Sequence, residues 1–399
     1  MSIVRGKRIL LGITGSIAAF KAAELASQLT QLGASVDAIL TPAAEKFISP
    51  LTLQSVTGRR AFTEVDLWGG EAHVLHIGLG RAADLQVIAP CTANTIAKLA
   101  HGQADNLLTI TSLVATCPLL VAPAMDGGML EHPATQENLA KLVERGATIA
   151  GPAEGHLASG LSGKGRLLEP EELLGYVRLL LGRKGPLAGK KVVVTAGGTQ
   201  EPLDPVRVLT NRSSGKQGYA VAQSAIDAGA QVTLISAPTA LTPPVGTSLV
   251  PVETAAQMRD AVLAACPQAD ALIMAAAVAD FRPKRTASEK MKTRDGIPQV
   301  ELESTEDILK AVARTERPRV VIGFAAESND LAGNASAKLK AKQLDLIVAN
   351  DITARDAGFG ADNNRVTLFD AAGQTESLPL APKSELADRI IERLTQLLG

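Results

Sequence analysis

The chain has few cysteines, few aromatic residues, no excess of charge of either sign and no long apolar run. Its three cysteines, Cys91, Cys117 and Cys266, are odd in number and widely spaced, so the sequence indicates neither a disulfide framework nor a zinc site. A reducing, cytoplasmic compartment is therefore expected. No apolar run reaches the length that a membrane span requires, and basic residues interrupt the apolar N-terminal segment, so no membrane association is expected.

The charge balance excludes two further classes of partner. Lys and Arg number 40 against 41 for Asp and Glu, which leaves no basic surface for nucleic acid or an anionic membrane. Aromatic residues make up 3% of the chain, too few for a platform on which bases stack. Small anionic ligands stay open, because they need only a local basic site.

The sequence contains two similar openings, at residues 7–41 and 190–236. Each predicts a buried strand, a glycine-rich turn, a helix and a second strand. At 399 residues the chain is long enough for two or three domains. We therefore expect an α/β fold with two Rossmann-like parallel-sheet domains, residues 1–185 and 186–399, and ligand sites at the carboxyl ends of the strands.

The two glycine-rich turns do not match a dinucleotide fingerprint. In the first, Gly12, Gly15 and Ser16 either hold a phosphate through backbone N–H groups or simply form a tight turn. In the second, Gly197 and Gly198 are adjacent, and a long polar segment separates them from the following helix. G-x-G-x-x-G spacing is absent, which disfavours a nicotinamide oxidoreductase.

Four motifs follow one another in the first half. His76 precedes a helical stretch, and after it come PCTANT from Pro90 to Thr95, PAMDGGM from Pro123 to Met129, and HLASGLSGKGRL from His156 to Leu167. Each alone is ordinary, since Asn and Thr commonly cap helices and a lone histidine is more often structural. In this order they resemble the homo-oligomeric flavin-containing cysteine decarboxylases, over residues 5–180.

That resemblance implies an FMN-dependent decarboxylation and assembly as trimers with flavin at the interfaces. His76 would act as acid and base, because imidazole exchanges protons near neutral pH, and Met129 would contact the substrate. The residues implied in FMN binding are Gly15, Ser16, Ile17, Thr41, Thr92, Ala93 and Asn94.

Two positions depart from the family pattern. Asp126 stands where the family has an Asn that contacts the substrate carboxylate, and Ser159 stands where the flap has a Cys that supplies a proton. An ionised Asp126 would repel that carboxylate, so we expect it to be protonated when substrate is bound. A serine hydroxyl is a far weaker acid than a thiol, and His156 is the nearest titratable replacement, although the sequence favours a surface histidine without a role.

The second half contains five further motifs: EPLDPVRVLTNRSSGKQGYA, AAAVADFRP, SEKMKT, GFAAES and KLKAKQLDLIVAND. Together they resemble the phosphopantothenate cysteine ligase domain. One chain with both halves in this order resembles the bifunctional phosphopantothenoylcysteine decarboxylase/phosphopantothenate cysteine ligase family of bacterial coenzyme A synthesis. The resemblance covers nearly the whole chain.

This second resemblance implies that CTP and Mg²⁺ activate 4'-phosphopantothenate as an acyl-cytidylate, which cysteine then attacks. The step brings together a triphosphate, a phosphate and a carboxylate, so it needs cations where negative charge accumulates. Lys290 would face the triphosphate, and Lys338 and Lys342, spaced i and i+4, would share one helical face. The other residues implied in CTP binding are Ala275, Ala276, Asp280 and Phe324.

The long polar segment after the second glycine turn also acquires roles by resemblance. Asn211 would hold the acyl-cytidylate for attack, and Arg207 would reach the site of a neighbouring subunit. Ser213, Ser214 and Gly215 would begin the helix that receives the phosphate of the substrate. Dimeric contacts of this half, added to the trimers of the first, make a dodecamer the expected assembly.

Three alternatives stay open at this stage. The lysines fit a solvated helix face, and the NRSSGK stretch fits a helix cap. The two departures also allow a ligase whose first half binds flavin and assembles the protein without decarboxylating. Preference for CTP over ATP, the metal ligands and feedback regulation are not encoded in any motif.

Overall fold

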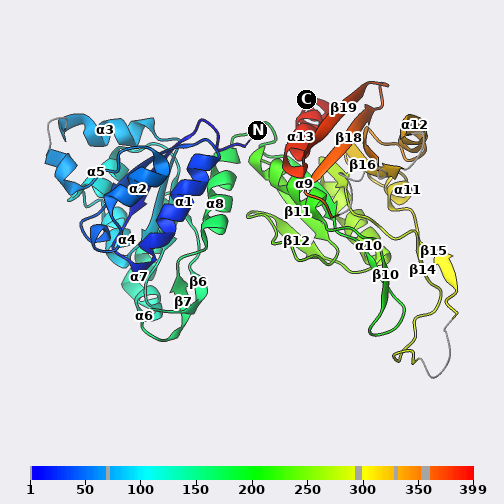
Figure 1. Cartoon of the computed structure of the whole chain (residues 1–399), viewed down its shortest axis with the longest axis horizontal. Helices are drawn as coiled ribbons and strands as arrows, with labels where there is room; N and C mark the ends of the chain where they lie inside the picture. Colours follow the sequence, from blue (N-terminus) through cyan, green and yellow to red (C-terminus); the bar gives the residue numbers. More distant parts are fainter. Residues whose placement is uncertain (1, 69–71, 293–298, 328–330, 352–359) are drawn as a thin grey trace. The chain divides into compact units, whose positions relative to one another are not determined.

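The computed structural model describes residues 2–68, 72–292, 299–327, 331–351 and 360–399. The chain divides into two compact units, Ser2–Leu181 and Gly182–Gly399 (Figure 1). Each is an α/β structure with a parallel sheet at its centre, which confirms the predicted fold class. No helix of the described residues combines the length and the apolarity that crossing a membrane requires.

The N-terminal unit has a five-stranded parallel sheet in the order β2-β1-β3-β4-β5. Its strands are β1 (Arg8–Ile13), β2 (Ser35–Leu40), β3 (Leu85–Cys91), β4 (Leu119–Pro123) and β5 (Thr148–Ile149). Its α-helices are α1 (Phe20–Gln31), α2 (Pro50–Thr57), α3 (Ala72–Ala82), α4 (Ala93–His101), α5 (Leu107–Val114), α6 (Gly127–Glu131), α7 (Pro133–Glu144) and α8 (Pro170–Gly182). The central strands are buried on both faces, as the apolar runs predict.

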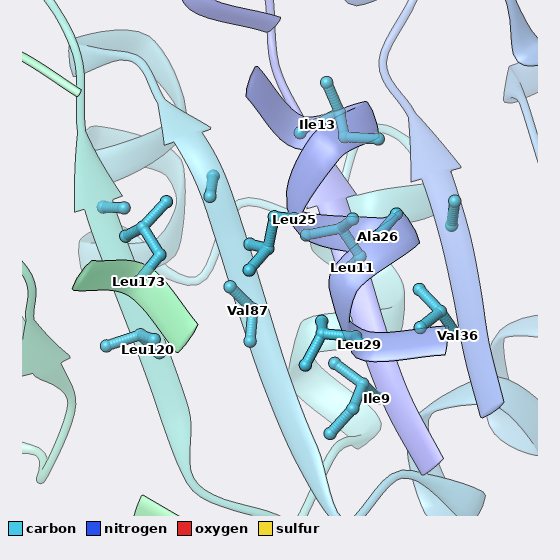
Figure 2. Packing of buried hydrophobic residues seen from close by; sticks show 14 of the residues in the cluster. Ile9, Leu11, Ile13, Leu25, Ala26, Leu29, Val36, Val87, Leu120 and Leu173 are labelled. Carbon is cyan, nitrogen blue, oxygen red and sulfur yellow. The ribbon is translucent and has the colours of Figure 1, made fainter. Parts of the chain in front are cut away.

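Helix α1 shows how the sequence determines this packing. Apolar residues recur at helical spacing, so Leu25, Ala26 and Leu29 all lie on the face that is fully buried. Figure 2 shows them packed against Leu11 and Val87 of the two central strands. The helix is thereby fixed on the sheet with its first turn above the carboxyl end of β1.

A two-stranded antiparallel hairpin follows β5. It consists of β6 (Ala153–His156) and β7 (Ser162–Arg166), and we call residues 153–166 the flap. Gly165 has a φ of 152°, and a Cβ at that position would collide with the Met125 carbonyl. The glycine therefore allows the flap to pack directly on the loop after β4.

The C-terminal unit has an eight-stranded sheet in the order β12-β11-β8-β13-β16-β17-β18-β19. These strands are β8 (Lys191–Ala196), β11 (Gln231–Ser236), β12 (Ser248–Pro251), β13 (Ala271–Met274), β16 (Val320–Glu327), β17 (Leu346–Asp351), β18 (Asn363–Asp370) and β19 (Thr375–Pro382). The first six are parallel, whereas β18 and β19 pair antiparallel at one edge. The expected parallel sheet is thus extended by an antiparallel edge that the sequence analysis did not predict.

Among the described residues, two small ladders, five α-helices and the 3-10 helix Cys266–Gln268 complete this unit. The ladders pair β9 (Gln200–Pro202) with β10 (Val208–Thr210), and β14 (Phe281–Pro283) with β15 (Leu302–Ser304). The helices are α9 (Lys216–Asp227), α10 (Ala255–Ala265), α11 (Ile308–Val312), α12 (Leu331–Ala341) and α13 (Lys383–Leu398). Figure 1 shows the β14–β15 hairpin in yellow, projecting away from the sheet of its unit.

Candidate functional site

The turns after β1, β3 and β4 and the flap enclose a cavity of about 590 Å³ in the N-terminal unit. Its lining includes many of the residues that the resemblance assigns to flavin or substrate: Gly15, Ser16, Ile17, Thr92, Asp126, Met129 and Ser159, with His156 beside them. Pockets for cofactors and drug-sized ligands commonly measure about 300–1,000 Å³. The cavity therefore has the size of a cofactor site and lies at the edge of the sheet where ligands of α/β folds bind.

The glycine turn leads directly into helical structure. Ser16 caps the short 3-10 helix Ile17–Ala19, and its hydroxyl accepts a hydrogen bond from the Ala18 N–H at 3.3 Å. Gly15 is close-packed, since an added Cβ would lie 2.5 Å from the Cβ of Ala43. This turn consequently tolerates no side chain at Gly15, and it presents the start of a helix to the cavity, which favours an anion.

Thr14 links the first two turns of the site, and the sequence analysis did not single it out. It is 1% exposed, and its hydroxyl donates to the Pro90 carbonyl at 2.7 Å and accepts from the Thr92 N–H at 3.0 Å. Both ends of the hydroxyl are therefore used to hold the PCTANT turn beside the glycine turn. Thr14 directly precedes Gly15, and this position in the sequence indicates that it belongs to the site. Its hydrogen-bond partners could not be predicted, because they lie 76 and 78 positions away.

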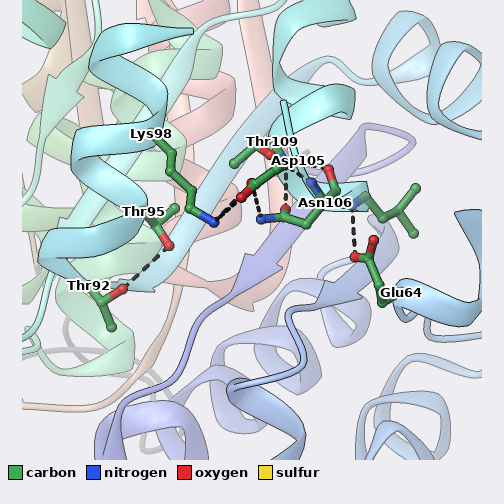
Figure 3. Close-up of polar contacts among 8 residues, drawn as sticks. Glu64, Thr92, Thr95, Lys98, Asp105, Asn106 and Thr109 are labelled. Carbon is green, nitrogen blue, oxygen red and sulfur yellow. Dashed lines mark hydrogen bonds and ion pairs between the residues drawn. The ribbon is translucent and has the colours of Figure 1, made fainter. Parts of the chain in front are cut away.

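The PCTANT turn passes into α4, and polar contacts fix that helix at both ends. Thr92 donates to the Thr95 hydroxyl at 3.4 Å at its start, and Lys98 pairs with Asp105 at 2.7 Å after its end, as Figure 3 shows. Asn106 then caps α5. Thr92 occupies the N-cap position of α4 without a side-chain cap hydrogen bond, and it also lines the cavity.

The two departures from the family pattern lie in direct contact. The Ser159 hydroxyl donates to Asp126 Oδ2 at 2.6 Å, and Asp126 Oδ1 accepts from the Gly128 N–H at 3.0 Å. A backbone hydrogen bond of 3.0 Å from the Met125 N–H to the Gly165 carbonyl joins the same two segments. The flap is therefore tied to the loop after β4 through both main chain and side chains.

This contact favours the ionised form of Asp126. The Ser159 hydroxyl, and after it the Gly128 N–H, hold the pKa of the Asp126 carboxyl below its usual range. The sequence argument expects a protonated Asp126 when substrate is bound. The hydrogen bonds of this structure favour the opposite, ionised state, so protonation of Asp126 would weaken or reverse the hydrogen bond from Ser159.

Two further buried side chains, those of Lys21 and Cys91, lie near the cavity. Lys21 lines it and is 8% exposed, and its ammonium donates to the Leu167 carbonyl at 3.1 Å and to Glu169 at 2.8 Å. The Cys91 thiol is fully buried, and this burial raises its pKa, so it stays protonated. Lys21 therefore supplies positive charge at the cavity wall, whereas Cys91 does not offer a thiolate there.

Four residues assigned by resemblance do not line this cavity: His76, Thr41, Ala93 and Asn94. His76 lies within α3 rather than ahead of a helix, because the helix begins at Ala72. Among the residues that the structure describes, its Nδ1 is buried without a hydrogen-bond partner. Thr41 is 8% exposed, and its hydroxyl contacts the end of β1 through the Ile13 carbonyl at 3.4 Å.

In the C-terminal unit the second glycine turn is assembled with the long segment that follows it. The Asn211 amide donates to the carbonyls of Ala277 and Val278 at 3.3 and 3.2 Å, directly after β13. Gly198 leaves room for this approach, since an added Cβ would lie 2.9 Å from the Asn211 carbonyl. Asn211 is thus held at the carboxyl end of the central strands, beside Ala275 and Ala276.

Buried threonines connect the strand ends of this unit, and the sequence analysis did not identify them. Thr195 accepts from the Ala276 N–H at 3.1 Å, and Thr199 accepts from the Ala279 N–H at 2.9 Å. Both are fully buried. They fix the backbone of the segment that runs from Ala275 to Asp280.

The phosphate-receiving stretch lies at the start of α9. The helix begins at Lys216, and Gly215 is its N-cap with a φ of 76°. Ser213 and Ser214 precede it and are half-buried. Lys216 is paired with Asp362 at 2.5 Å, so its positive charge is already balanced in this structure.

The lysines expected to bind the nucleotide lie in two different segments of the C-terminal unit. Lys342 follows α12 directly, donates its N–H to the Lys338 carbonyl at 3.0 Å and pairs with Asp307 at 3.1 Å. Asp307 is two residues after Thr305, which donates its N–H to the Asp280 carbonyl at 3.0 Å. Lys342 is therefore linked to the Asp280 region.

Lys290 and Phe324 occupy different settings. Lys290 is exposed, on the segment that connects β14 with β15. Phe324 is half-buried in β16, opposite Val348 of β17.

Arg207 contacts its own chain. It pairs with Asp204 at 3.2 Å and donates to the Met291 carbonyl at 3.2 Å. Burial raises the pKa of Asp204, but the N–H groups of Val206, Arg207 and Met291 outweigh it and hold that pKa below its usual range. Arg207 is thus placed beside the segment that carries Lys290.

Two cavities of the C-terminal unit, of about 190 and 290 Å³, lie around Arg282, and their linings contain none of the residues assigned to CTP. Among the described residues no three His, Cys, Asp or Glu side chains are grouped so that they could hold a metal ion. Mg²⁺ commonly binds through one or two carboxylates and substrate phosphates, so a magnesium site of that kind does not require such a group.

Both units match known protein families. Residues 3–182 match the family described as Flavoprotein, and residues 187–398 match the DNA/pantothenate metabolism flavoprotein C-terminal domain. The coenzyme A biosynthesis bifunctional protein CoaBC of Bacillus subtilis is 44% identical over 398 residues, which cover 99% of this chain and 98% of that protein. CoaBC of Mycobacterium tuberculosis is 43% identical over 409 residues, covering 98% and 97%.

Solved structures resemble one unit each. The C-terminal domain of a CoaBC protein shares 40% identity, with a TM-score of 0.47, and covers 54% of this chain and 98% of that one. A PPC decarboxylase variant complexed with pantothenoylaminoethenethiol shares 39% identity, with a TM-score of 0.40, and covers 44% of this chain and 98% of that one.

Proposed function

Because the chain belongs to the family of coenzyme A biosynthesis bifunctional proteins CoaBC, we propose that its C-terminal unit joins 4'-phosphopantothenate to cysteine and its N-terminal unit decarboxylates the product to 4'-phosphopantetheine. The cavity of about 590 Å³ carries this proposal on the structural side. It gathers the glycine turn, the PCTANT turn, the loop after β4 and the flap around one space. A cytoplasmic location stays the prediction made from cysteine usage.

The residues around this cavity fit FMN. The turn at Gly15 and Ser16 offers backbone N–H groups at the start of a helix for the phosphate, and Ile17 and Met129 offer apolar surface for the ring system. Thr92 supplies a polar group beside the glycine turn. When bound, FMN would supply the redox chemistry that a cysteine-derived thiol needs before it loses carbon dioxide.

The chain's own groups would then position the substrate and exclude water. The flap covers the cavity with Leu157 and Ser159, and Lys21 contributes a cation at the wall. Asp126 departs from the amide of the family pattern, and in its ionised form it opposes a substrate carboxylate. We therefore propose real but slow decarboxylation.

The role that we propose for His76 depends on the proposed assembly. His76 is outside the cavity of its own chain and carries a buried nitrogen without a partner. The trimer implied by the family resemblance places flavin at interfaces, so a second copy can bring its His76 to the cavity as acid and base. The dodecamer, with dimeric contacts of the C-terminal units, is proposed on the same resemblance.

For the ligase step we propose CTP, with Mg²⁺ bound mainly through its phosphates. Asn211, fixed at the end of β13, would donate to the acyl phosphate, and Lys290 would stabilise charge on the triphosphate. Asp280 and Lys342 would contact the nucleotide from the neighbouring segment, with Phe324 toward the base. The remaining contacts proposed for CTP and substrate are Ala275, Ala276, Lys338, Ser213, Ser214 and Gly215.

Asn211→Asp tests the ligase assignment. A carboxylate accepts but cannot donate, and it repels the acyl phosphate, so the variant should form the acyl-cytidylate without passing it to cysteine. Mass spectrometry of a reaction with CTP and phosphopantothenate should detect accumulated intermediate. If the variant forms no intermediate while its fold is intact, the role of Asn211 is wrong.

The contact between Asp126 and Ser159 specifically favours one second function. It leaves neither an amide donor nor a thiol at the positions where the family has them. The alternative is a ligase whose N-terminal unit binds flavin and assembles the protein without decarboxylating. Flavin retention together with no carbon dioxide release at any pH would support it.

A further inference from the structure

Asp204 is a buried carboxylate to which the proposed mechanism gives no role. It is 2% exposed, in the segment between β9 and β10. Its Oδ1 accepts from the N–H groups of Val206 and Arg207, both at 2.8 Å. Those two bonds close a local turn of the type that Asp commonly forms. The other oxygen, Oδ2, accepts from the Met291 N–H at 3.2 Å, a residue 87 positions away.

Met291 is held on both sides by one ion pair. Its N–H donates to Asp204, and its carbonyl accepts from Arg207 Nη2 at 3.2 Å. Asp204 and Arg207 also contact each other, through Oδ2 and Nη1 at 3.2 Å. The three residues therefore form a closed set of contacts around the main chain that directly follows Lys290.

The same segment is tied at two earlier points. We call residues 284–292 the lysine segment. Ala287 donates its N–H to the Leu203 carbonyl at 3.0 Å, and the Thr286 hydroxyl donates to the Pro202 carbonyl at 3.1 Å. Lys290 itself and most of its neighbours are exposed, so apolar burial contributes little here. Polar contacts with residues 202–207 consequently determine where the lysine segment lies.

We propose that Asp204 is a positioning residue for the ligase step, which with Arg207 fixes the main chain at Met291 and so holds the Lys290 ammonium where charge develops on the nucleotide phosphates. The inference rests on the proposed role of Lys290. Alignment of a cation matters most in the transition state, so its loss lowers turnover more than it weakens nucleotide binding.

Asp204→Asn tests the proposal, with Glu201→Gln as the matched control. Asparagine keeps the size of the side chain but directs an amide NH₂ at groups that are themselves donors. Glu201 is equally buried at 2%, and its carboxylate accepts the N–H of Ala255, the first residue of α10, at 2.8 Å. Both variants are made in the full chain, with Lys290 intact and with Lys290→Gln, and pyrophosphate formation from CTP and phosphopantothenate is measured.

With Lys290 intact, Asp204→Asn should lower the turnover of pyrophosphate formation by about tenfold, the usual scale for a lost bond to a charged group, with a smaller change in KM for CTP. In the Lys290→Gln background the same change should cost less than about twofold, because coupled residues are not additive. Glu201→Gln should have the same effect in both backgrounds. Equal losses from Asp204→Asn in both backgrounds would overturn the proposal. Unchanged turnover of Lys290→Gln alone would instead remove the proposed role of Lys290.

Two further measurements keep the proposal testable if Asp204→Asn folds poorly. Thr286→Val removes an exposed tie of the lysine segment, and it should lower turnover roughly twofold to fivefold only when Lys290 is present. Hydrogen exchange of the peptide 284–292 should become at least about tenfold faster in Asp204→Asn and stay unchanged in Glu201→Gln. Unchanged exchange in Asp204→Asn, or a Thr286→Val effect that does not depend on Lys290, would also overturn it.

Discussion

The two glycine turns open similar strand-turn-helix units, yet they lead to different kinds of site. After β1 the turn passes within a few residues into helical structure and borders a cavity of about 590 Å³. After β8 about twenty residues and the β9–β10 ladder intervene before α9 begins at Lys216. The first site is thus formed largely by short turns at strand ends, whereas the second depends on longer segments that side-chain contacts must hold.

This difference separates two ways of building a site. In the N-terminal unit Thr14 connects two turns, and two short hydrogen-bonded contacts tie the flap to the loop after β4. In the C-terminal unit Asn211 is fixed at a strand end, but Lys290 lies on an exposed segment held by polar contacts. Substitutions should therefore affect flavin binding in the first unit and the alignment of charges in the second.

The largest expected effect is that of His76→Asn on decarboxylation. Asparagine cannot exchange a proton near neutral pH, so carbon dioxide release should fall by at least about 100-fold while flavin stays bound. Flavin absorbance and carbon dioxide release on the same sample make the measurement. His101→Asn is the control, since His101 contacts Asn138 on the surface at 3.0 Å. Release at the wild-type rate from His76→Asn would remove it from the reaction.

Lys290→Gln should lower pyrophosphate formation by roughly 100-fold, corresponding to about 3 kcal/mol for one group that stabilises developing charge. Binding of CTP should weaken much less. Lys284→Gln serves as the control, because Lys284 is exposed on the same segment and pairs with Glu301 at 3.6 Å. If both variants turn over alike, Lys290 lies outside the ligase site.

Asp126→Asn should increase decarboxylation, by roughly tenfold in kcat/KM, because it replaces a repelling charge with an amide donor. Since the pKa of Asp126 is lowered, the ionised form and its bond from Ser159 are present at neutral pH and are lost as pH falls through that pKa. Wild-type release should accordingly rise toward acid pH on this limb, and Asp126→Asn should lose the limb.

Ser159→Ala tests the same pH dependence of carbon dioxide release. Removing the hydroxyl should raise the pKa of Asp126 toward its usual range, so the acidic limb should move to higher pH. A His156→Gln variant tests the other titratable group of the flap. Identical profiles for wild type and His156→Gln would exclude His156, and an unshifted limb in Ser159→Ala would separate Asp126 from the pH dependence.

The smallest expected effect is that of Thr14→Val, which keeps the shape but leaves the Pro90 carbonyl and the Thr92 N–H without their partner. Unsatisfied buried groups typically cost about 1–3 kcal/mol, so the unfolding midpoint should fall and flavin should bind less tightly. Thermal unfolding with and without added FMN measures both. An unchanged affinity for FMN would show that Thr14 supports only the fold.

The sequence predicted those features of the fold that local residue patterns determine. Apolar periodicity gave both parallel sheets, and motif order gave the flap and the loop that meet at Asp126 and Ser159. The sequence could not show that these two side chains touch, because they are 33 positions apart. The antiparallel edge formed by β18 and β19 was missed, since it lies beyond the motifs.

Long-range polar contacts were also beyond the sequence. Asp204 lies in a motif that the resemblance used, but nothing in its neighbours shows that it accepts the N–H of Met291. The hydroxyl of Thr199 accepts a hydrogen bond from the Ala279 N–H, and this contact could not be predicted for the same reason. The assignments of site residues by resemblance stay predictions, and His76 shows their limit, because it is outside the cavity of its own chain.

The central claim is that one chain carries out both steps in succession. The most direct measurement combines the purified full-length protein with CTP, Mg²⁺, phosphopantothenate and cysteine labelled in its carboxyl carbon, and follows pyrophosphate and labelled carbon dioxide together. We expect pyrophosphate first and carbon dioxide after it, reaching one equivalent of each, with neither formed when CTP is left out. Pyrophosphate with no carbon dioxide at any pH would contradict the decarboxylase half, and no pyrophosphate would contradict the ligase half.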